Sequence, residues 1–152
     1  MPCFHTQNFA TISYETDSVL EFPRGLPGFE ERRRFLALQF ADSAPLVFLQ
    51  SLEDSGLCFI TMPVLVLDRE YQLHVSAEDR AQVGLPPARG LRIGEDVACL
   101  AVISVRESGC TANLLAPVVV NLRNRRAIQS VAAESGYAHQ HPLVPEEAPV
   151  CS

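Results

Sequence analysis

Short apolar segments alternate with polar, turn-forming segments along most of the chain. The apolar segments are residues 10–14, 19–22, 35–40, 46–52, 58–62, 64–67, 71–75, 100–105, 110–115 and 118–121. The connections between them are short and rich in Gly, Pro, Ser and Asp, which favours hairpin turns. Within residues 71–75, apolar and polar side chains alternate, which is typical of a half-buried strand. Many short strands at close spacing indicate an antiparallel β-sandwich or barrel.

One short helix is predicted over Ala77–Val83. Ser76 is suited to cap its first turn, and Asp79 follows three residues later. Gly84 suits the left-handed position at the end of a helix, and the prolines at 86 and 87 prevent continuation. We therefore predict a mainly β fold with a single short helix.

The last apolar segment and the chain ends are less defined by their pattern. Residues 128–131 fit either a final strand or a short helix, because local pattern does not distinguish the two. The chain of 152 residues suits one domain with a real core. We place that core at about residues 10–143, with flexible segments at both ends, including the Pro- and Glu-containing tail after residue 144.

One apolar run carries polar residues in its interior. Asn113 and Asn121 each donate and accept through the side-chain amide. Pro117 cannot donate to a sheet ladder and therefore predicts a strand edge, a bulge or a break. Leu114 and Val119 flank it and are expected in the core. For the two asparagines, a local bond to the backbone is the commoner role and a functional site is the alternative.

The charge balance restricts the partners. The net charge is −6, and all 12 basic residues are Arg. The absence of Lys excludes Schiff-base chemistry and a phosphate-loop lysine. The acidic balance argues against direct nucleic-acid binding and favours a basic protein partner. The apolar runs are too short to span a bilayer, and the polar first eight residues do not resemble a signal peptide, so no membrane association is expected.

Cysteine usage indicates a reducing compartment. The chain has five Cys residues at positions 3, 58, 99, 110 and 151, without C-x-x-C spacing. An odd number with this spacing argues against a disulfide framework and against a zinc site. Cys58 and Cys99 lie in apolar runs and are expected in the core, whereas Cys3 and Cys151 lie near the ends. A cytoplasmic location is therefore expected.

Acidic residues in turns are the first candidates for a partner-binding surface. Glu53 and Asp54 lie in a turn, where Asp commonly bonds its own backbone, so an acid/base pair is disfavoured. They fit a solvated turn or an acidic contact surface. Asp68 and Glu70 flank the same group of strands. We expect these four carboxylates to form part of the surface that meets a basic partner.

Two further clusters could be either a ligand-binding site or an ordinary solvent-exposed surface. His139 and His141 would face the same way in an extended segment, but no Cys or carboxylate completes a metal site, so a surface pair is favoured. Arg123, Arg125 and Arg126 would suit a phosphate or RNA. In an acidic chain, three such arginines are more often a solvated face or ion-pair partners.

The last two candidate sites are a possible nucleophile, Cys110, and the exposed loop at residues 25–28. Cys110 could act with one of the four His residues, since such partners need not be near in sequence. This leaves a Cys-dependent hydrolase, or a β-barrel that binds a small molecule, as the alternative function. The loop at Gly25 to Gly28 is expected to expose Leu26 and Phe29, which would suit an apolar partner.

Four motifs, in order along the chain, resemble one known family. They are FPRGLPGFE at 22–30, FLQSLED at 48–54, TANLLAPVVVN at 111–121, and RRAIQ at 125–129 with Tyr137 and HPL at 141–143. Together they resemble the flagellar assembly factor FliW family over roughly residues 10–143. The chain departs from the family pattern at Ser55-Gly56, where Pro is usual, and at Met62, where an acidic residue usually precedes Pro.

The resemblance implies both a fold and a function. It implies a small, partly open antiparallel β-barrel with one short helix. It also implies a non-enzymatic, cofactor-free, chaperone-like cytoplasmic protein that binds newly made flagellin. Such a protein would also bind the translational regulator CsrA and relieve its repression of flagellin synthesis. The acidic charge of this chain suits a basic RNA-binding partner of that kind.

Overall fold

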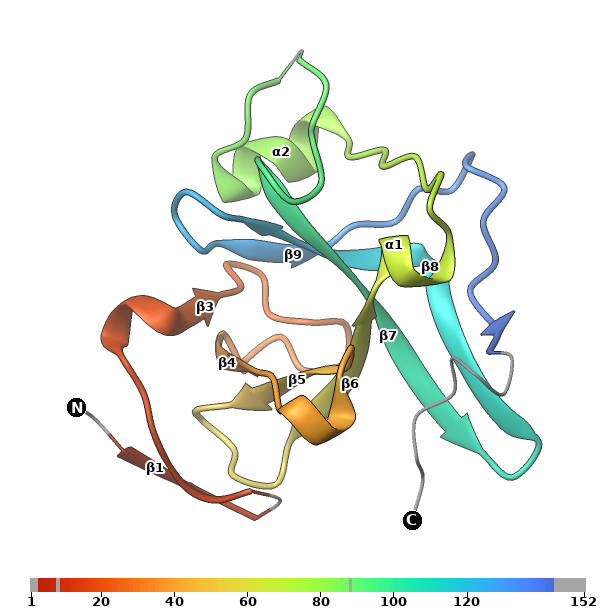
Figure 1. Ribbon diagram of the computed structural model, residues 1–152. Helices are drawn as coiled ribbons and strands as arrows, with labels where there is room; N and C mark the ends of the chain where they lie inside the picture. Colours follow the sequence, from red (N-terminus) through yellow and green to blue (C-terminus); the bar gives the residue numbers. More distant parts are fainter. Residues whose placement is uncertain (1–2, 8, 88, 144–152) are drawn as a thin grey trace.

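The computed structural model describes residues 3–7, 9–87 and 89–143, and within them the fold is mainly β, as predicted (Figure 1). The strands are β1 (Cys3–Thr6), β2 (Ala10–Ser13), β3 (Val19–Glu21), β4 (Arg34–Leu38), β5 (Val47–Ser51), β6 (Cys58–Pro63), β7 (Val97–Arg106), β8 (Gly109–Asn121), β9 (Ala127–Gln129) and β10 (His141–Pro142). The helices are α1 (Val64–Leu67) and α2 (Ala77–Val83), with 3-10 turns η1 (Thr16–Ser18) and η2 (Ala41–Ser43). Among the described residues, no helix combines the length and the hydrophobicity that crossing a bilayer requires. The predicted flexible tail after residue 144, with Cys151, lies outside the described residues.

The main sheet curls into a nearly closed antiparallel barrel with one seam. Its strand order is β10-β8-β7-β6-β5-β4-β3, and β9 also pairs with β8. At the seam, β3 approaches β9, because Glu21 forms a bridge with Arg126 and its amide donates to the Arg125 carbonyl at 3.0 Å. A separate hairpin, β1–β2, is held to the barrel by the Gln7 amide, which donates to the Ser55 carbonyl at 3.0 Å. Strand β1 therefore lies ahead of residue 10.

Two apolar clusters cover the two faces of the sheet. The inner cluster fills the barrel with Leu20, Phe22, Leu26, Phe35, Val47, Leu49, Leu100, Val118, Val120 and Ala127. The outer cluster lies between the sheet and the α1–α2 segment, and includes Met62, Val64, Tyr71, Val75, Val83, Cys99, Ala101, Leu114, Val119 and Ile128. Successive residues alternate between the two clusters over Val97 to Ile103 of β7 and Val118 to Val120 of β8. Because both faces of these strands are buried, their sequences are nearly continuous apolar runs.

A bulge in β8 explains the polar residues within its apolar run. Strand pairing shifts from Leu100 opposite Val118 to Val102 opposite Asn113, so four residues of β8 lie opposite one residue of β7. Pro117 lies in this bulge, in agreement with the prediction. The Asn113 Oδ1 atom accepts hydrogen bonds from the amides of residues 115 and 116, at 3.1 and 3.0 Å. Asn113 therefore satisfies two amides that the bulge removes from the ladder.

The second asparagine joins β8 to helix α2, which has the predicted bounds. The Ser76 side chain accepts from the Asp79 amide at 3.1 Å, and Gly84 has a φ of 73°. At the helix end, Asn121 Nδ2 donates to the Val83 carbonyl at 2.8 Å, and its Oδ1 accepts from the amide of residue 123 at 2.9 Å. Both asparagines thus bond the backbone, which is the commoner of the two roles expected for them.

Two predicted strands are wrong. Val64–Leu67 forms the single-turn helix α1, which follows Pro63 and closes with the Asp68 amide donating to the Val64 carbonyl at 2.9 Å. A run of four apolar residues has no period that separates strand from helix. Residues 71–75 keep the predicted alternation of burial but join no strand ladder. Alternating burial needs only packing against the sheet on one side and does not require a partner strand.

Candidate protein-interaction surface

The carboxylate of Glu53 braces two segments of the barrel. Its Oε1 atom accepts hydrogen bonds from the amides of Arg33 and Arg34, at 2.6 and 2.9 Å. These two backbone hydrogen bonds lower the pKa of Glu53 below its usual value of 4.5. The charged form therefore holds the start of β4 against the β5–β6 turn, while the side chain stays exposed to solvent.

Asp54 also bonds its own turn, as the sequence suggested. Its Oδ1 atom accepts from the Gly56 amide at 3.1 Å. The Arg32 guanidinium lies beside it, with Nε 3.9 Å from Asp54 Oδ2. Arginines 32 to 34 therefore reduce the negative charge of this turn. Because both carboxylates are engaged with backbone amides, they do not form a converging acid/base pair.

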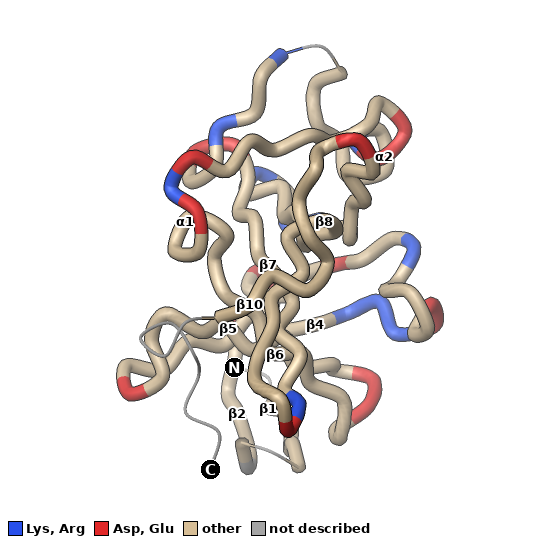
Figure 2. Tube along the Cα trace, turned by 90° about the vertical axis from the view of Figure 1, so that its right-hand side faces the viewer, with Lys and Arg blue, Asp and Glu red and all other residues tan. Residues whose placement is uncertain are grey.

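The other two predicted carboxylates lie at the opposite end of β6. Asp68 follows α1, and its Oδ1 atom accepts from the Glu70 amide at 2.9 Å, while Glu70 is exposed. Six residues of β6 separate the two turns, which is about 20 Å of extended chain. Acidic positions are spread over several separate loops (Figure 2). The structure therefore does not bring the four carboxylates together as one patch.

The Gly25 to Gly28 loop exposes only one of its two predicted contact residues. Phe29 is 40% exposed, but Leu26 is 3% exposed and belongs to the inner cluster, so its predicted exposure is wrong. The loop folds back on itself, because the Phe29 amide donates to the Leu26 carbonyl at 2.7 Å. Gly25 has a φ of 63°, and a Cβ there would lie 2.6 Å from the Glu30 backbone. This tight turn directs Leu26 into the barrel.

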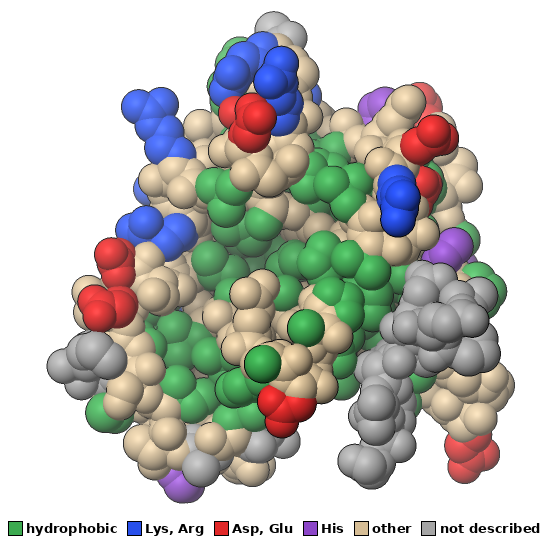
Figure 3. Space-filling view, in the orientation of Figure 1, with side chains coloured by type: hydrophobic (Ala, Val, Ile, Leu, Met, Phe, Trp, Pro, Cys, Tyr) green, Lys and Arg blue, Asp and Glu red, His purple; other side chains and the backbone are tan. Residues whose placement is uncertain are grey.

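An exposed apolar surface, not anticipated from the sequence, lies on the side of η2 and α1. Phe9, Phe40 and Phe48 form an aromatic cluster, with ring centroids 5.2 to 5.9 Å apart. Phe40 is 40% exposed, and Leu65 and Val66 of α1 are 37% and 46% exposed. We call these five residues the apolar face; Figure 3 shows hydrophobic side chains gathered over the middle of this side.

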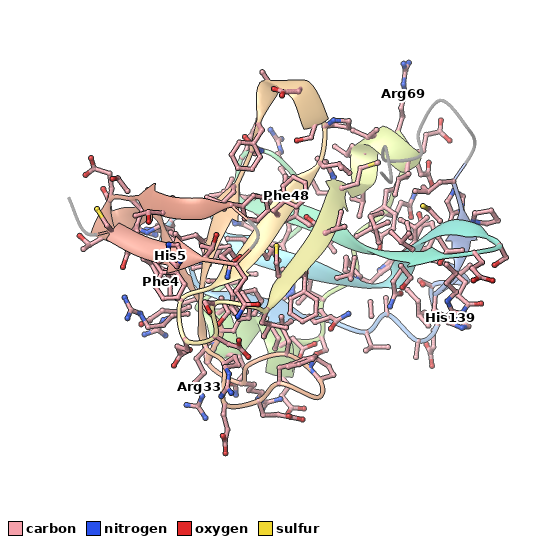
Figure 4. The ribbon with its side chains drawn as sticks, turned by 90° about the horizontal axis from the view of Figure 1, so that it is seen from below. Phe4, His5, Arg33, Phe48, Arg69 and His139 are labelled. Atoms are coloured by element: carbon pink, nitrogen blue, oxygen red, sulfur yellow. The ribbon has the colours of Figure 1, made fainter. Side chains whose placement is uncertain are left out.

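The apolar face and the Glu53 turn point in different directions. Figure 4 shows Phe48 on the side of η2 and α1, whereas Arg33, whose amide bonds Glu53, lies on the opposite side of the barrel. The signal in the sequence is the apolar run at residues 64–67, which predicts a strand. Leu65 and Val66 point outward because this run forms the helical turn α1 instead of a strand.

The remaining candidates do not converge on a reaction centre. Burial raises the pKa of Cys58 to about 11 and that of Cys99 to about 12, which keeps both thiols protonated at neutral pH. Cys110 is half-buried in β8, opposite Val105. Within the described residues, no three His, Cys, Asp or Glu side chains, including His139 and His141, are arranged to hold a metal ion.

The barrel interior is filled by side chains, and the three arginines of the cluster lie in one turn. Phe22, Phe35 and Leu49 are fully buried within the inner cluster, so the barrel is filled by its own side chains. Small barrels are commonly filled in this way by their inward-facing side chains. Arginines 123, 125 and 126 lie in the exposed turn between β8 and β9, where Arg125 has a φ of 61°. Arg123 and Arg126 are exposed in this turn, and Arg125 is half-buried.

Comparison with known proteins gives one consistent family. The model of the FliW protein family matches residues 3–143. Flagellar assembly factor FliW of Bacillus subtilis is 29% identical over 141 residues, covering 91% of this chain and 94% of the relative. FliW of Bacillus licheniformis is 32% identical over 140 residues, with 91% and 94% coverage.

A solved structure agrees with the sequence comparisons. The crystal structure of a flagellar assembly factor FliW superposes with a TM-score of 0.81 at 26% identity, and covers 97% of this chain and 100% of that chain. The match includes the barrel, the two helices and nearly all of the described residues. Sequence and fold therefore agree over the same span, and the chain belongs to the FliW family of flagellar assembly factors.

Proposed function

We propose that this chain is a cytoplasmic, chaperone-like protein that binds flagellin and antagonises the translational regulator CsrA, without catalysing a reaction. Competition between the two partners would couple the amount of flagellin to its translation. Family membership supports the role in flagellar assembly. The observation that carries the binding role is the apolar face, in which Phe40, Leu65 and Val66 are 40%, 37% and 46% exposed.

The apolar face suits a filament subunit that has not yet been assembled. Such a subunit exposes surfaces that it later buries in the polymer, and these surfaces need cover to prevent premature association. A binding surface of this kind needs a central apolar contact, with charged residues at its rim. The face has both features, because Asp42 of η2 and the acidic residues after α1 lie next to it in sequence.

Val66→Asp is expected to weaken flagellin binding about tenfold or more, because it buries an unpaired charge at the centre of the contact. Val66 is 46% exposed, so the fold should tolerate the change. Val105→Asp is the matched control, since Val105 is 49% exposed but lies near the β7–β8 turn. Isothermal titration calorimetry with purified flagellin measures the affinity of both variants. Equal affinities for the two variants would remove the apolar face from the flagellin site.

Glu53→Gln with Asp54→Asn is expected to slow association with CsrA about two- to tenfold at low salt, since rim charges mainly change the association rate. These substitutions keep the oxygens that accept from the amides of Arg33 and Gly56, so the turn retains its structure. The difference should shrink as salt rises. Stopped-flow mixing with purified CsrA measures the rates.

Asp68→Asn with Glu70→Gln is the comparison pair, with the same charge change at the other end of β6. Because the two turns lie far apart, one pair should have the larger effect and thereby locate the regulator. If neither pair alters the rate at low or moderate salt, the acidic turns do not contact CsrA.

A further inference from the structure

The two proposed partner surfaces lie on different sides of the barrel, and the β1–β2 hairpin touches both. In the described residues, this hairpin forms a sheet of its own and pairs with no strand of the barrel (Figure 1). Its loop places Phe9 in the apolar face, with the ring centroid 5.2 Å from that of Phe48. In the same loop, Gln7 bonds the turn that carries Glu53 and Asp54. The hairpin therefore connects the apolar face to the Glu53 turn.

The contact at the Glu53 turn is close. The Gln7 amide donates to the Ser55 carbonyl at 3.0 Å, and Gln7 Nε2 donates to Ser55 Oγ at 3.4 Å. A Cβ at Gly56 would lie 2.8 Å from Gln7 Oε1, so the glycine leaves room for the Gln7 side chain. The Gly56 amide in turn donates to Asp54 Oδ1 at 3.1 Å. The position of Gln7 therefore acts on the segment that presents the Asp54 carboxylate.

The docked hairpin lies against a buried acceptor that has no partner. Gln50 on β5 is fully buried. Its Nε2 atom donates to three carbonyls of the following turn, at 3.0, 3.4 and 3.3 Å, those of Ser51, Asp54 and Ser55. These acceptors fix the orientation of the amide, and its Oε1 atom has no hydrogen-bond partner in the described residues. Because Gln7 and Gln50 donate to the same Ser55 oxygen, the hairpin loop covers Gln50, and this unpaired acceptor makes docking less favourable.

The hairpin can leave the barrel without breaking a strand ladder. A two-stranded hairpin has little stability of its own and depends on what it packs against. Phe9 is half-buried, and its ring packs on Phe40 and Phe48. Those two rings also contact each other, with centroids 5.9 Å apart, so they stay together when Phe9 is removed. An apolar surface of a partner can therefore replace the Phe9 ring while the sheet stays intact.

We propose that the β1–β2 hairpin relays flagellin binding at the apolar face to the Glu53 turn, where it weakens the binding of CsrA. Flagellin takes the place of the Phe9 ring, the hairpin leaves, and Gln7 releases Ser55. The Glu53 turn then loses a contact that holds it. By thermodynamic reciprocity, CsrA on this turn favours the docked hairpin and weakens flagellin binding by the same factor. The relay rests on the proposed function, and it lets the two partners compete without sharing contact residues.

Gln7→Cys with Ser55→Cys tests the relay within one variant. The backbones of these residues lie within hydrogen-bond distance, a spacing that suits a disulfide. In the reduced variant, saturating flagellin should weaken CsrA binding about tenfold or more, as in the unchanged protein. In the oxidised variant the hairpin cannot leave, so flagellin should change the affinity for CsrA less than about twofold. Isothermal titration calorimetry measures the affinities, and mass spectrometry verifies the bond between residues 7 and 55.

Phe9→Ala tests the docking of the hairpin without any partner. Loss of the ring should release the hairpin, so hydrogen exchange at the Gln7 amide should become about tenfold faster or more. Phe4→Ala is the matched control, because Phe4 is also half-buried on the hairpin but lies outside the aromatic cluster. It should change this exchange less than about twofold. In the unchanged protein, saturating flagellin should speed exchange at the same amide.

Failure of the relay differs from failure of the proposed function. If flagellin or CsrA does not bind the unchanged protein, the proposed function is wrong and the relay is wrong with it. The relay alone is overturned if both bind and the reduced and oxidised variants respond equally to flagellin. It is also overturned if the Gln7 amide stays protected in Phe9→Ala or in the flagellin complex.

Discussion

Phe35→Ala is expected to lower the free energy of unfolding by about 3 to 5 kcal/mol, among the largest effects of any single substitution in this chain. Phe35 is fully buried on β4, and its ring lies 5.2 Å from Phe22 and 6.0 Å from Phe59, measured between centroids. Removing the ring leaves a cavity at the centre of the inner cluster, which the surrounding strands cannot close without breaking their pairing. Urea denaturation followed by circular dichroism measures the loss.

Phe29→Ala is the control for this prediction. The same atoms are removed, and Phe29 also contacts Phe59, with ring centroids 5.4 Å apart. Phe29 is 40% exposed, so no closed cavity forms and the loss should be about 1 kcal/mol or less. Similar losses for the two variants would mean that the interior of the barrel is not the tightly packed core described above.

Leu114→Ala is expected to cost about 2 to 5 kcal/mol, because Leu114 is 2% exposed within the outer cluster. The residue lies in the β8 bulge, where its carbonyl accepts from the Tyr71 hydroxyl and its amide donates to the Ala138 carbonyl at 3.0 Å. Its side chain thus packs where β8 meets the α1–α2 segment. The midpoint of urea unfolding should fall with little change in slope.

Leu65→Ala is the matched control, since Leu65 is 37% exposed on α1. It should cost well under 2 kcal/mol, about what the smaller change in buried area predicts. If Leu114→Ala leaves the unfolding midpoint unchanged, the bulge does not contribute its side chain to the core. The two truncations, in the inner and outer clusters, also test whether both faces of the sheet stabilise the fold.

The elements that depend on near neighbours were predictable from the sequence. Helix α2 begins and ends where Ser76 and Gly84 predicted, because a cap needs only residues within one or two turns. The irregularity at Pro117 was predictable for the same reason, since proline lacks the amide that a ladder needs. The role of Asn113 is also local, since its partners lie two and three residues away, whereas Asn121 bonds Val83, which only the fold brings to it.

The site depended on contacts between distant residues. Glu53 was identified as a surface carboxylate, but its bonds to the amides of Arg33 and Arg34 arise only when β4 pairs with β5. The distance between the Glu53 turn and Glu70 is set by the length of β6, which no local pattern contains. The Glu53 turn and Glu70 therefore do not share one surface, although they lie close in the sequence.

Hydrophobicity and turn chemistry along the chain determined strands β2 to β8, the helix α2 and the apolar character of β7 and β8, because these follow from local geometry and burial. Tertiary structure alone decided which apolar residues remain exposed to solvent. Leu26 enters the barrel and Leu65 remains exposed, although both are leucines in turn-like segments. The physical reason is that burial depends on the packing of segments distant in sequence, and the side chains left uncovered by that packing form the apolar face.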